Sequence, residues 1–123
     1  MTKIAIIEDD PTISQMYRTK FESNGFDVQL AVNGKLGVEM VESYSPDIIL
    51  LDLQMPEMNG TDALKIIRSK DWGKNIPVII LTNMGEEESP KDLKSLGVLG
   101  YIVKANLTPS QVVDKVKQAL NLT

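Results

Sequence analysis

Five short apolar segments, rich in aliphatic and β-branched residues, recur along the chain. They lie at residues 3–7, 27–31, 47–51, 77–81 and 100–103, and segments with helical spacing of apolar residues separate them. Three of them are apolar almost throughout, as in strands that helices cover on both faces, whereas "DVQLA" alternates like an edge strand. The pattern predicts a doubly wound α/β domain made of five strand and helix units.

The predicted helices lie at residues 11–23, 34–43, 60–69, 86–95 and 109–120. Asp10 and Pro11 suit the cap and first turn of the first helix, and Thr108 and Pro109 repeat that arrangement before the last one. In a doubly wound sheet, ligands bind beyond the carboxyl ends of the strands, where the strand order reverses. The residues directly after each strand are therefore the first candidates for chemistry.

Composition limits that chemistry. At 123 residues the chain has the size of one domain, and it contains neither cysteine nor histidine, so serine triads and the common zinc sites are excluded. A net charge of -4 with scattered lysines gives no basic surface for nucleic acid. Because no apolar run approaches the roughly 20 residues of a membrane span, and no signal peptide is present, we expect a cytoplasmic protein without membrane contact.

Polar side chains follow four of the five strands. They are Glu8, Asp9 and Asp10 after the first, Asp52 after the third, Thr82 after the fourth and Lys104 after the fifth. If the first and third strands are neighbours, Glu8, Asp9 and Asp52 converge and raise one another's pKa. Mg²⁺ would relieve this repulsion, because it takes oxygen ligands and often combines carboxylates with a phosphate. We interpret Asp10 as a helix cap rather than a ligand.

Asp52 is the candidate nucleophile of this group. A carboxylate can attack a phosphoryl group to form an acyl phosphate, and the transfer needs mainly positioning and neutralisation of negative charge. Mg²⁺, Lys104 and Thr82 could supply both. This gives the acidic residue at the end of the apolar segment "IILLD" a function.

Four motifs give the chain a family resemblance over essentially its whole length, residues 1–123. They are "IIEDDP" at 6–11, "LLDLQMPEMNG" at 50–60, "ILTN" at 80–83 and "GYIVKA" at 100–105. The sequence resembles the receiver domains of two-component response regulators, chemotaxis regulators among them. The resemblance implies a flavodoxin-like fold with strand order 2-1-3-4-5.

The same resemblance implies the roles of the acidic residues. Asp52 matches the aspartate that accepts the phosphoryl group, and Asp9 matches a direct Mg²⁺ ligand. Glu8 would reach the metal through water, and Gln54 would contribute its backbone carbonyl. Asp10 falls just outside the metal pair.

Three further residues match the family's catalytic residues, Thr82 and Lys104, and its conformational switch, Thr82 and Tyr101. Thr82 corresponds to the hydroxyl residue that moves toward the phosphoryl group, Lys104 to the lysine that pairs with it, and Tyr101 to the aromatic residue whose rotamer reports activation. The resemblance also implies partners: a histidine kinase or phosphotransfer protein that offers a phosphohistidine, and a downstream protein target. The protein would be a monomer or a dimer formed on phosphorylation.

The sequence departs from the family pattern at two places. Ala105 stands where the family has a proline after the lysine, usually with a cis bond, so the Lys104–Ala105 bond is open to either isomer. Asn83 stands directly after Thr82, where the family commonly has a small residue, and Met84 follows it. We hypothesise that these two residues, together with Gln54, tune the lifetime of the phosphoryl group.

Several alternatives stay open. The chain could be a receiver-like module that binds partners without phosphorylation, or a phosphohydrolase with Asp52 as nucleophile, although Gln54 stands where such enzymes have a second acid. It resembles a single-domain regulator and could equally be a receiver from a longer protein. The acidic run Glu86, Glu87 and Glu88 suits the first turn of a helix, or a charge that selects partners.

Overall fold

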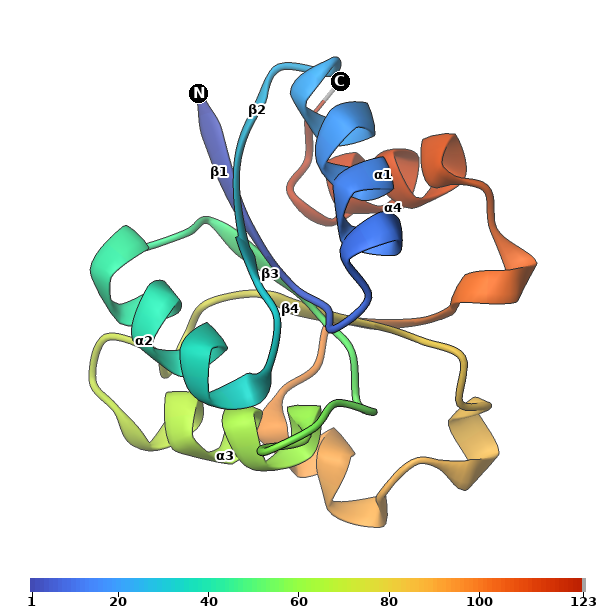
Figure 1. The fold of residues 1–123 in the computed structure, drawn as a ribbon. Coiled ribbons are helices and arrows are strands. Elements are labelled where there is room, and N and C mark those ends of the chain that lie inside the picture. Colours follow the sequence, from blue (N-terminus) through green and yellow to red (C-terminus); the bar gives the residue numbers. More distant parts are fainter. Residues whose placement is uncertain (123) are drawn as a thin grey trace.

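The computed structural model describes residues 1–122, which form one five-stranded parallel sheet (Figure 1). The strands are β1 (Thr2–Ile7), β2 (Phe26–Ala31), β3 (Ile48–Leu51), β4 (Val78–Thr82) and β5 (Gly100–Val103). Their order is β2-β1-β3-β4-β5, so the predicted fold class and strand order are confirmed. The chain order reverses between β1 and β3, which is where ligands are expected in such a sheet.

Four α-helices cover the sheet. They are α1 (Pro11–Glu22), α2 (Gly34–Tyr44), α3 (Gly60–Ser69) and α4 (Pro109–Ala119). Helices α1 and α4 lie together on one face, and α2 and α3 lie together on the other (Figure 1). Within residues 1–122, no helix has the length and apolar character needed to cross a membrane.

The segment between β4 and β5 differs from the sequence prediction. One helix was expected over 86–95, but the chain forms two short 3-10 helices, η1 (Glu86–Glu88) and η2 (Lys91–Leu96). Pro90 explains the break, because a proline disfavours the α conformation of the residue before it, and Ser89 is extended with φ -70° and ψ 155°. A third 3-10 helix, η3 (Lys104–Asn106), follows β5.

Both predicted helix caps are present. The Asp10 side chain accepts hydrogen bonds from the backbone N–H groups of Thr12 and Ile13 at 2.9 and 3.2 Å. Thr108 and Gln111 exchange hydrogen bonds between side chain and backbone in a capping box at the start of α4. These caps fix the start of the helices that follow β1 and η3.

The core lies on both faces of the sheet. On one face, Ile4 and Ile6 of β1 pack with Phe21 of α1 and Val112 of α4. On the other face, Ile7, Ile49 and Leu51 pack with residues of α2 and α3, Val41 and Leu64 among them. Because β3 and the last four residues of β1 are fully buried, the next residue of each strand emerges at a fixed point on the edge of the sheet.

Arg68 of α3 connects three segments through backbone carbonyls. Its guanidinium donates to the carbonyl oxygens of Leu96, Gly73 and Ile76 at 2.7 to 2.8 Å, and to that of Gly97 at 3.3 Å. These bonds join the end of η2 to α3 and to the loop before β4. The Arg68 side chain therefore helps to position the segment between β4 and β5 against the rest of the domain.

Replacing Arg68 by Met should lower the free energy of unfolding by about 2 kcal/mol, because half-buried carbonyls lose their donor. Urea unfolding followed by circular dichroism measures this difference. Lys70→Met is the control, since the Lys70 side chain is exposed, and its effect should stay within about 0.5 kcal/mol. Equal losses in the two variants would contradict the role assigned to the guanidinium.

Candidate functional site

The site lies at the carboxyl ends of β1 and β3, which are adjacent and in register. Ile7 pairs with Leu51, so Glu8 and Asp52 each follow the strand by one residue. The N–H of Asp52 donates to the carbonyl of Ile7 at 3.0 Å, and that of Glu8 to the carbonyl of Ala31 at 3.0 Å. The parallel ladder thus brings together the two acids that the sequence places 44 residues apart.

Asp52 is the most strongly bonded of these acids. Only 5% of it is exposed, and its Oδ1 accepts a hydrogen bond from the N–H of Gln54 at 3.1 Å. Its Oδ2 accepts one from Lys104 Nζ at 3.0 Å. Both carboxylate oxygens are therefore oriented by donors that come from different parts of the chain.

Lys104 joins the two buried carboxylates. Its ammonium group also donates to Glu8 Oε1, so it lies between β1 and β3 although it belongs to the segment after β5. No peptide bond within residues 1–122 is cis, so the Lys104–Ala105 bond is trans. The sequence left the isomer of this bond open, because Ala105 replaces the usual proline. The structure shows that Lys104 reaches Asp52 with a trans bond.

The electrostatics of the three groups depend on one another. Burial raises the pKa of Glu8 to about 7, and the neighbouring Asp52 adds to the shift while Lys104 opposes it. Burial would also raise the pKa of Asp52, but interactions with Glu8, the N–H of Gln54 and Lys104 outweigh it and lower the pKa. For Lys104, the two carboxyl groups outweigh burial and raise the pKa.

The acidic residues fit a divalent cation. Glu8, Asp9 and Asp52 each offer a carboxylate oxygen, and these oxygens lie within 4.8 Å of one another. Glu8 Oε2 is buried and has no hydrogen-bond partner among the described residues, so it is free to face an ion or its water. Oxygen donors at this spacing suit Mg²⁺. Asp10 is occupied as the cap of α1, as predicted.

The predicted switch residues meet at the main chain of Met84. Thr82 is fully buried, and its Oγ1 accepts a long hydrogen bond of 3.4 Å from the N–H of Met84. The hydroxyl of Tyr101 donates to the carbonyl of Met84 at 2.8 Å. One residue of the loop after β4 thus contacts both side chains, one through each of its peptide groups.

The two departures near Thr82 differ in exposure. Asn83 is exposed, whereas Met84 is partly buried and packs against the core face that contains Leu53 and Leu64. The side chain of Gln54 is also exposed. The influence of these three residues on phosphoryl lifetime, and the Gln54 carbonyl as a metal ligand, stay predictions.

Two glycines position the loop after Asp52. A Cβ on Gly60 would lie 2.0 Å from the carbonyl oxygen of Asp52, and one on Gly34 would lie 2.4 Å from that of Met58. The N–H of Gly60 donates to the carbonyl of Leu53, and that of Gly34 to Met58, both at 3.1 Å. The starts of α2 and α3 therefore hold both ends of the loop.

Neither glycine was predicted as a functional residue, although the sequence contains a signal for both. Each follows an asparagine, Asn33 or Asn59, whose side chain caps the helix that the glycine begins. Two "NG" pairs at predicted helix starts indicate a backbone that must approach another closely. What the backbone approaches is visible only in the folded chain.

Comparison with known proteins identifies the class. The response regulator receiver domain family matches residues 4–117. The chain belongs to this family. Receiver domains of response regulators act in signalling with histidine kinases or phosphotransfer proteins and downstream targets, and they typically bind Mg²⁺ at an acidic pocket.

Several relatives match nearly the full length of the chain. The chain is 35% identical over 122 residues to the chemotaxis protein CheY of Bacillus subtilis, and the match covers 98% of this chain and 96% of the relative. It is 34% identical over 120 residues to sporulation initiation phosphotransferase F of the same organism, covering 98% and 94%. The solved structure of Vibrio cholerae chemotaxis protein CheY4 superposes with a TM-score of 0.89 at 25% identity, covering 97% and 98%.

Other curated relatives are longer. The chain spans 22%, 43% and 48% of the length of three regulatory proteins that it matches at 33 to 36% identity. The chain is therefore similar to one part of each of these three proteins.

The raised pKa of Glu8 predicts a pH dependence for the metal-free protein. The folded chain keeps a proton on Glu8 up to a pH of about 7, whereas the unfolded chain releases it near 4.5. The free energy of unfolding should therefore fall as pH rises from 4.5 to about 7. Urea unfolding in chelator across this range, with Glu8→Gln as comparison, measures the slope, which the variant should lack.

The pKa of Asp52 shifts in the opposite direction and affects stability at lower pH. Because this pKa is lowered, Asp52 contributes stability that is lost only as the pH falls below 3.8. An identical slope in the parent and Glu8→Gln proteins between 4.5 and 7 would contradict the assignment to Glu8.

Gly60→Ala should destabilise the protein by about 3 kcal/mol, because its methyl group overlaps the backbone of Asp52 and forces the loop to move. Gly100→Ala is the matched control, since a Cβ there lies at ordinary distances of 3.7 and 3.9 Å from Ile79. Chemical unfolding compares the two. A Gly60→Ala protein as stable as the control would show that the loop yields without cost.

Proposed function

We propose that the chain is a phosphorylation-dependent switch in which Asp52 accepts a phosphoryl group from a phosphohistidine on a histidine kinase or phosphotransfer protein. The observation that supports this most is the pairing of buried Asp52 with Lys104 beside two further carboxylates. We also propose that residues 1–123 act as one receiver domain in the cytoplasm.

In the proposed transfer, an Asp52 carboxylate oxygen attacks the phosphorus as the bond to the imidazole nitrogen breaks. The electron pair of that bond returns to the ring, which is a good leaving group when protonated at its other nitrogen. The product is an acyl phosphate on Asp52, whose extra charge needs neutralisation. Mg²⁺ held by the acidic residues would supply part of that neutralisation.

The protein's own residues supply the rest. Lys104 neutralises Glu8 and Asp52 in the structure. If a cation were held by these carboxylates, the Lys104 ammonium group would be available to pair with a phosphoryl oxygen. Thr82 is the hydroxyl donor at the end of the neighbouring strand β4. The expected metal ligands are Asp9 and Asp52, the carbonyl of Gln54, and Glu8 through water.

The conformational response would pass through Met84. If the Thr82 hydroxyl turns toward the phosphoryl group, it releases the N–H of Met84, whose carbonyl accepts from Tyr101. A change in this loop alters the contacts of Tyr101 and the surface around η1 and η2, where a downstream partner would respond. The proposed assistance of the protein to its own phosphorylation and dephosphorylation would come from Lys104, Thr82 and the bound cation, which position and neutralise the phosphoryl group.

The two alternatives have less support. A phosphohydrolase of this kind would need a second acid two residues after the nucleophile, but position 54 is an exposed glutamine. A module independent of phosphorylation would not require the acceptor, lysine and threonine together, and all three meet at this site.

Incubation with acetyl phosphate and Mg²⁺ should add the mass of one phosphoryl group, and Asp52→Asn or a chelator should abolish the addition. Intact-mass spectrometry measures the product, and Asp10→Asn, which preserves the helix cap, should label normally. Because fast hydrolysis can hide the product, amide shifts of Thr82 and Tyr101 on adding beryllofluoride complete the experiment. Labelling of Asp52→Asn, or neither labelling nor shifts in the parent protein, would overturn the proposal.

A further inference from the structure

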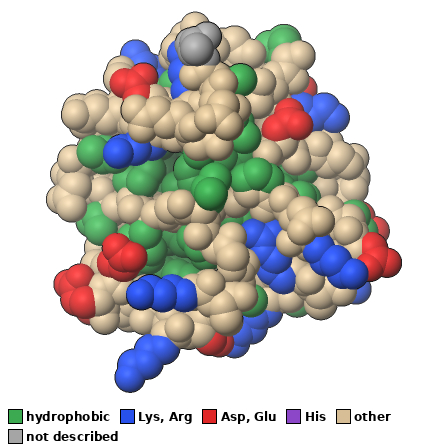
Figure 2. Space-filling model, turned by 180° about the vertical axis from the view of Figure 1, so that it is seen from behind, with side chains coloured by type: hydrophobic (Ala, Val, Ile, Leu, Met, Phe, Trp, Pro, Cys, Tyr) green, Lys and Arg blue, Asp and Glu red, His purple; other side chains and the backbone are tan. Residues whose placement is uncertain are grey.

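The chain contains six methionines and no cysteine. Two-electron oxidants such as peroxides react with thiolates and with thioethers, so in this protein the methionine sulfurs are their main targets. Exposure alone does not decide which oxidation matters. Met1 and Met16 are exposed, and apolar side chains reach the surface in a band across the face shown in Figure 2. The contacts of each methionine decide whether its oxidation changes the structure.

Met84 is bonded to both predicted switch residues through its main chain. Its N–H donates to Thr82 Oγ1 at 3.4 Å, and its carbonyl accepts from the Tyr101 hydroxyl at 2.8 Å. Its side chain is partly buried and packs against the core face that contains Leu53 and Leu93. Because one residue makes all three contacts, a change in the packing of its thioether also shifts the two hydrogen bonds.

A cavity of about 280 Å³ lies beside Met84. Leu53 lines it together with Met84, and so do Asn59, Thr61 and Lys65, whose side chains have hydrogen-bond donors. A water molecule occupies about 30 Å³ in the liquid, so a molecule as small as hydrogen peroxide can enter this space. Met84 is therefore accessible to a small oxidant, although the core covers part of it.

The reaction of a thioether with hydrogen peroxide transfers one oxygen atom. A lone pair of the sulfur attacks one peroxide oxygen, and the O–O bond breaks as the S–O bond forms. The proton on the transferred oxygen passes to the hydroxide that leaves, so the products are a sulfoxide and water. The sulfur is oxidised by two electrons and the peroxide is reduced by two. The product is polar where the thioether was apolar.

A sulfoxide does not suit the place that the Met84 side chain occupies. Burying a polar group against Leu53 without a hydrogen bond costs free energy, whereas the donors of the adjoining cavity, Lys65 among them, could satisfy the sulfoxide oxygen. We therefore expect the oxidised side chain to turn from the core toward the cavity. Because the peptide groups of Met84 contact Thr82 and Tyr101, this turn would displace both hydrogen bonds.

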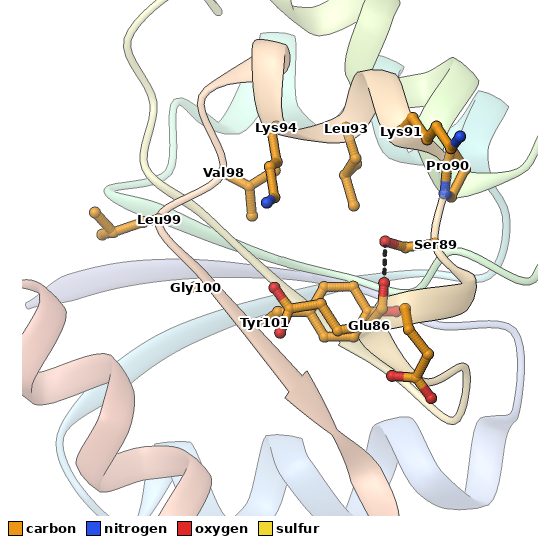
Figure 3. A pocket seen from close by; sticks show the side chains of 11 residues that line it. Glu86, Ser89, Pro90, Lys91, Leu93, Lys94, Val98, Leu99, Gly100 and Tyr101 are labelled. Atoms are coloured by element: carbon orange, nitrogen blue, oxygen red, sulfur yellow. Dashed lines mark hydrogen bonds between the residues drawn. The ribbon is translucent and has the colours of Figure 1, made fainter.

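Figure 3 shows the segment that this movement would reach. Tyr101 lines a cavity together with Glu86, the first residue of η1, and the Ser89 hydroxyl donates to the Glu86 carbonyl at 2.6 Å. The loop that contains Met84 leads directly into η1. A shift of Met84 would therefore be transmitted to η1 along the chain and through Tyr101.

We propose that Met84 is a site of oxidation by hydrogen peroxide, and that its sulfoxide changes the hydrogen bonds of Thr82 and Tyr101. An oxidant would then act on the loop that contacts both switch residues without a phosphoryl group on Asp52. The inference goes beyond the proposed function, because both the oxidation and its structural effect are measured in the unphosphorylated chain.

The full, unphosphorylated chain is treated with millimolar hydrogen peroxide, and peptide mapping by mass spectrometry follows the addition of an oxygen atom at each methionine. Amide shifts of Thr82 and Tyr101 are recorded over the same time course. We expect these shifts to grow with the fraction of Met84 sulfoxide and not with that of Met16, which is 44% exposed and lies on α1. Methionine sulfoxide reductases, one for each sulfoxide epimer, should restore the original signals.

Met84→Leu is the matched variant, because leucine keeps the volume and the apolar packing but cannot form a sulfoxide. Peroxide should leave its Thr82 and Tyr101 signals unchanged, whereas Met16→Leu should respond as the parent does. Met84→Gln, which places a polar side chain there without an oxidant, should move the Tyr101 signal toward its position in the oxidised parent.

Any of four results would overturn the proposal. Met84 could stay unoxidised after Met16 has reacted completely, or its sulfoxide could form without shifts at Thr82 and Tyr101. Peroxide could produce the same shifts in Met84→Leu as in the parent, which would assign them to another methionine. The Tyr101 signal of Met84→Gln could also stay at its position in the untreated parent.

Discussion

The buried cluster of Lys104 with Glu8 and Asp52 is the interaction on which the rest of the site depends. Ionised groups taken out of water need partners, and removing one member of such a buried set typically costs about 3 to 5 kcal/mol. Here one ammonium group contacts two carboxyl groups. Because the pKa of Glu8 is raised to about 7, Glu8 keeps its proton below that pH, which reduces the repulsion between the two acids. The Lys104 ammonium group and a proton on Glu8 together neutralise the cluster. A cation bound by the carboxylates would take the place of that proton.

This cluster depends on the sheet. Asp52 and Glu8 are adjacent because β1 and β3 pair in register, and the Asp52 loop is held by glycines at the starts of α2 and α3. The lysine arrives from the far side of β4, across the same carboxyl edge. A shift of any of these strands by one residue would turn a buried acid to the opposite face and separate the charges.

The region around η1 and η2 is built differently from the rest of the domain. Pro90 prevents a continuous helix. The region is held against α3 by the hydrogen bond from Arg68 to Leu96 and by the ion pair of Lys65 with Asp92, at 2.8 Å. Tyr101 contacts this region through Met84 and also belongs to the edge strand β5. The loop after β4, which follows Thr82, is therefore in contact with the edge of the sheet.

The sequence by itself determined the fold class, the caps at Asp10 and Thr108, and the residues that gather at the site, because hydrophobic period and cap chemistry are local properties. Residues 60–69 were predicted as the third helix with the bounds it has. The helix predicted over 86–95 was wrong in form, because the prediction did not account for Pro90, which separates η1 from η2.

Tertiary structure alone decided the features that join distant segments. The reach of Lys104 across a trans bond, the pKa of Glu8 and the meeting of Thr82 with Tyr101 at Met84 all depend on distances between segments far apart in sequence. The contact of Gly60 with Asp52 and the place of β5 at the edge of the sheet are of the same kind. Such properties arise from burial and close approach, which a linear pattern of residues does not specify.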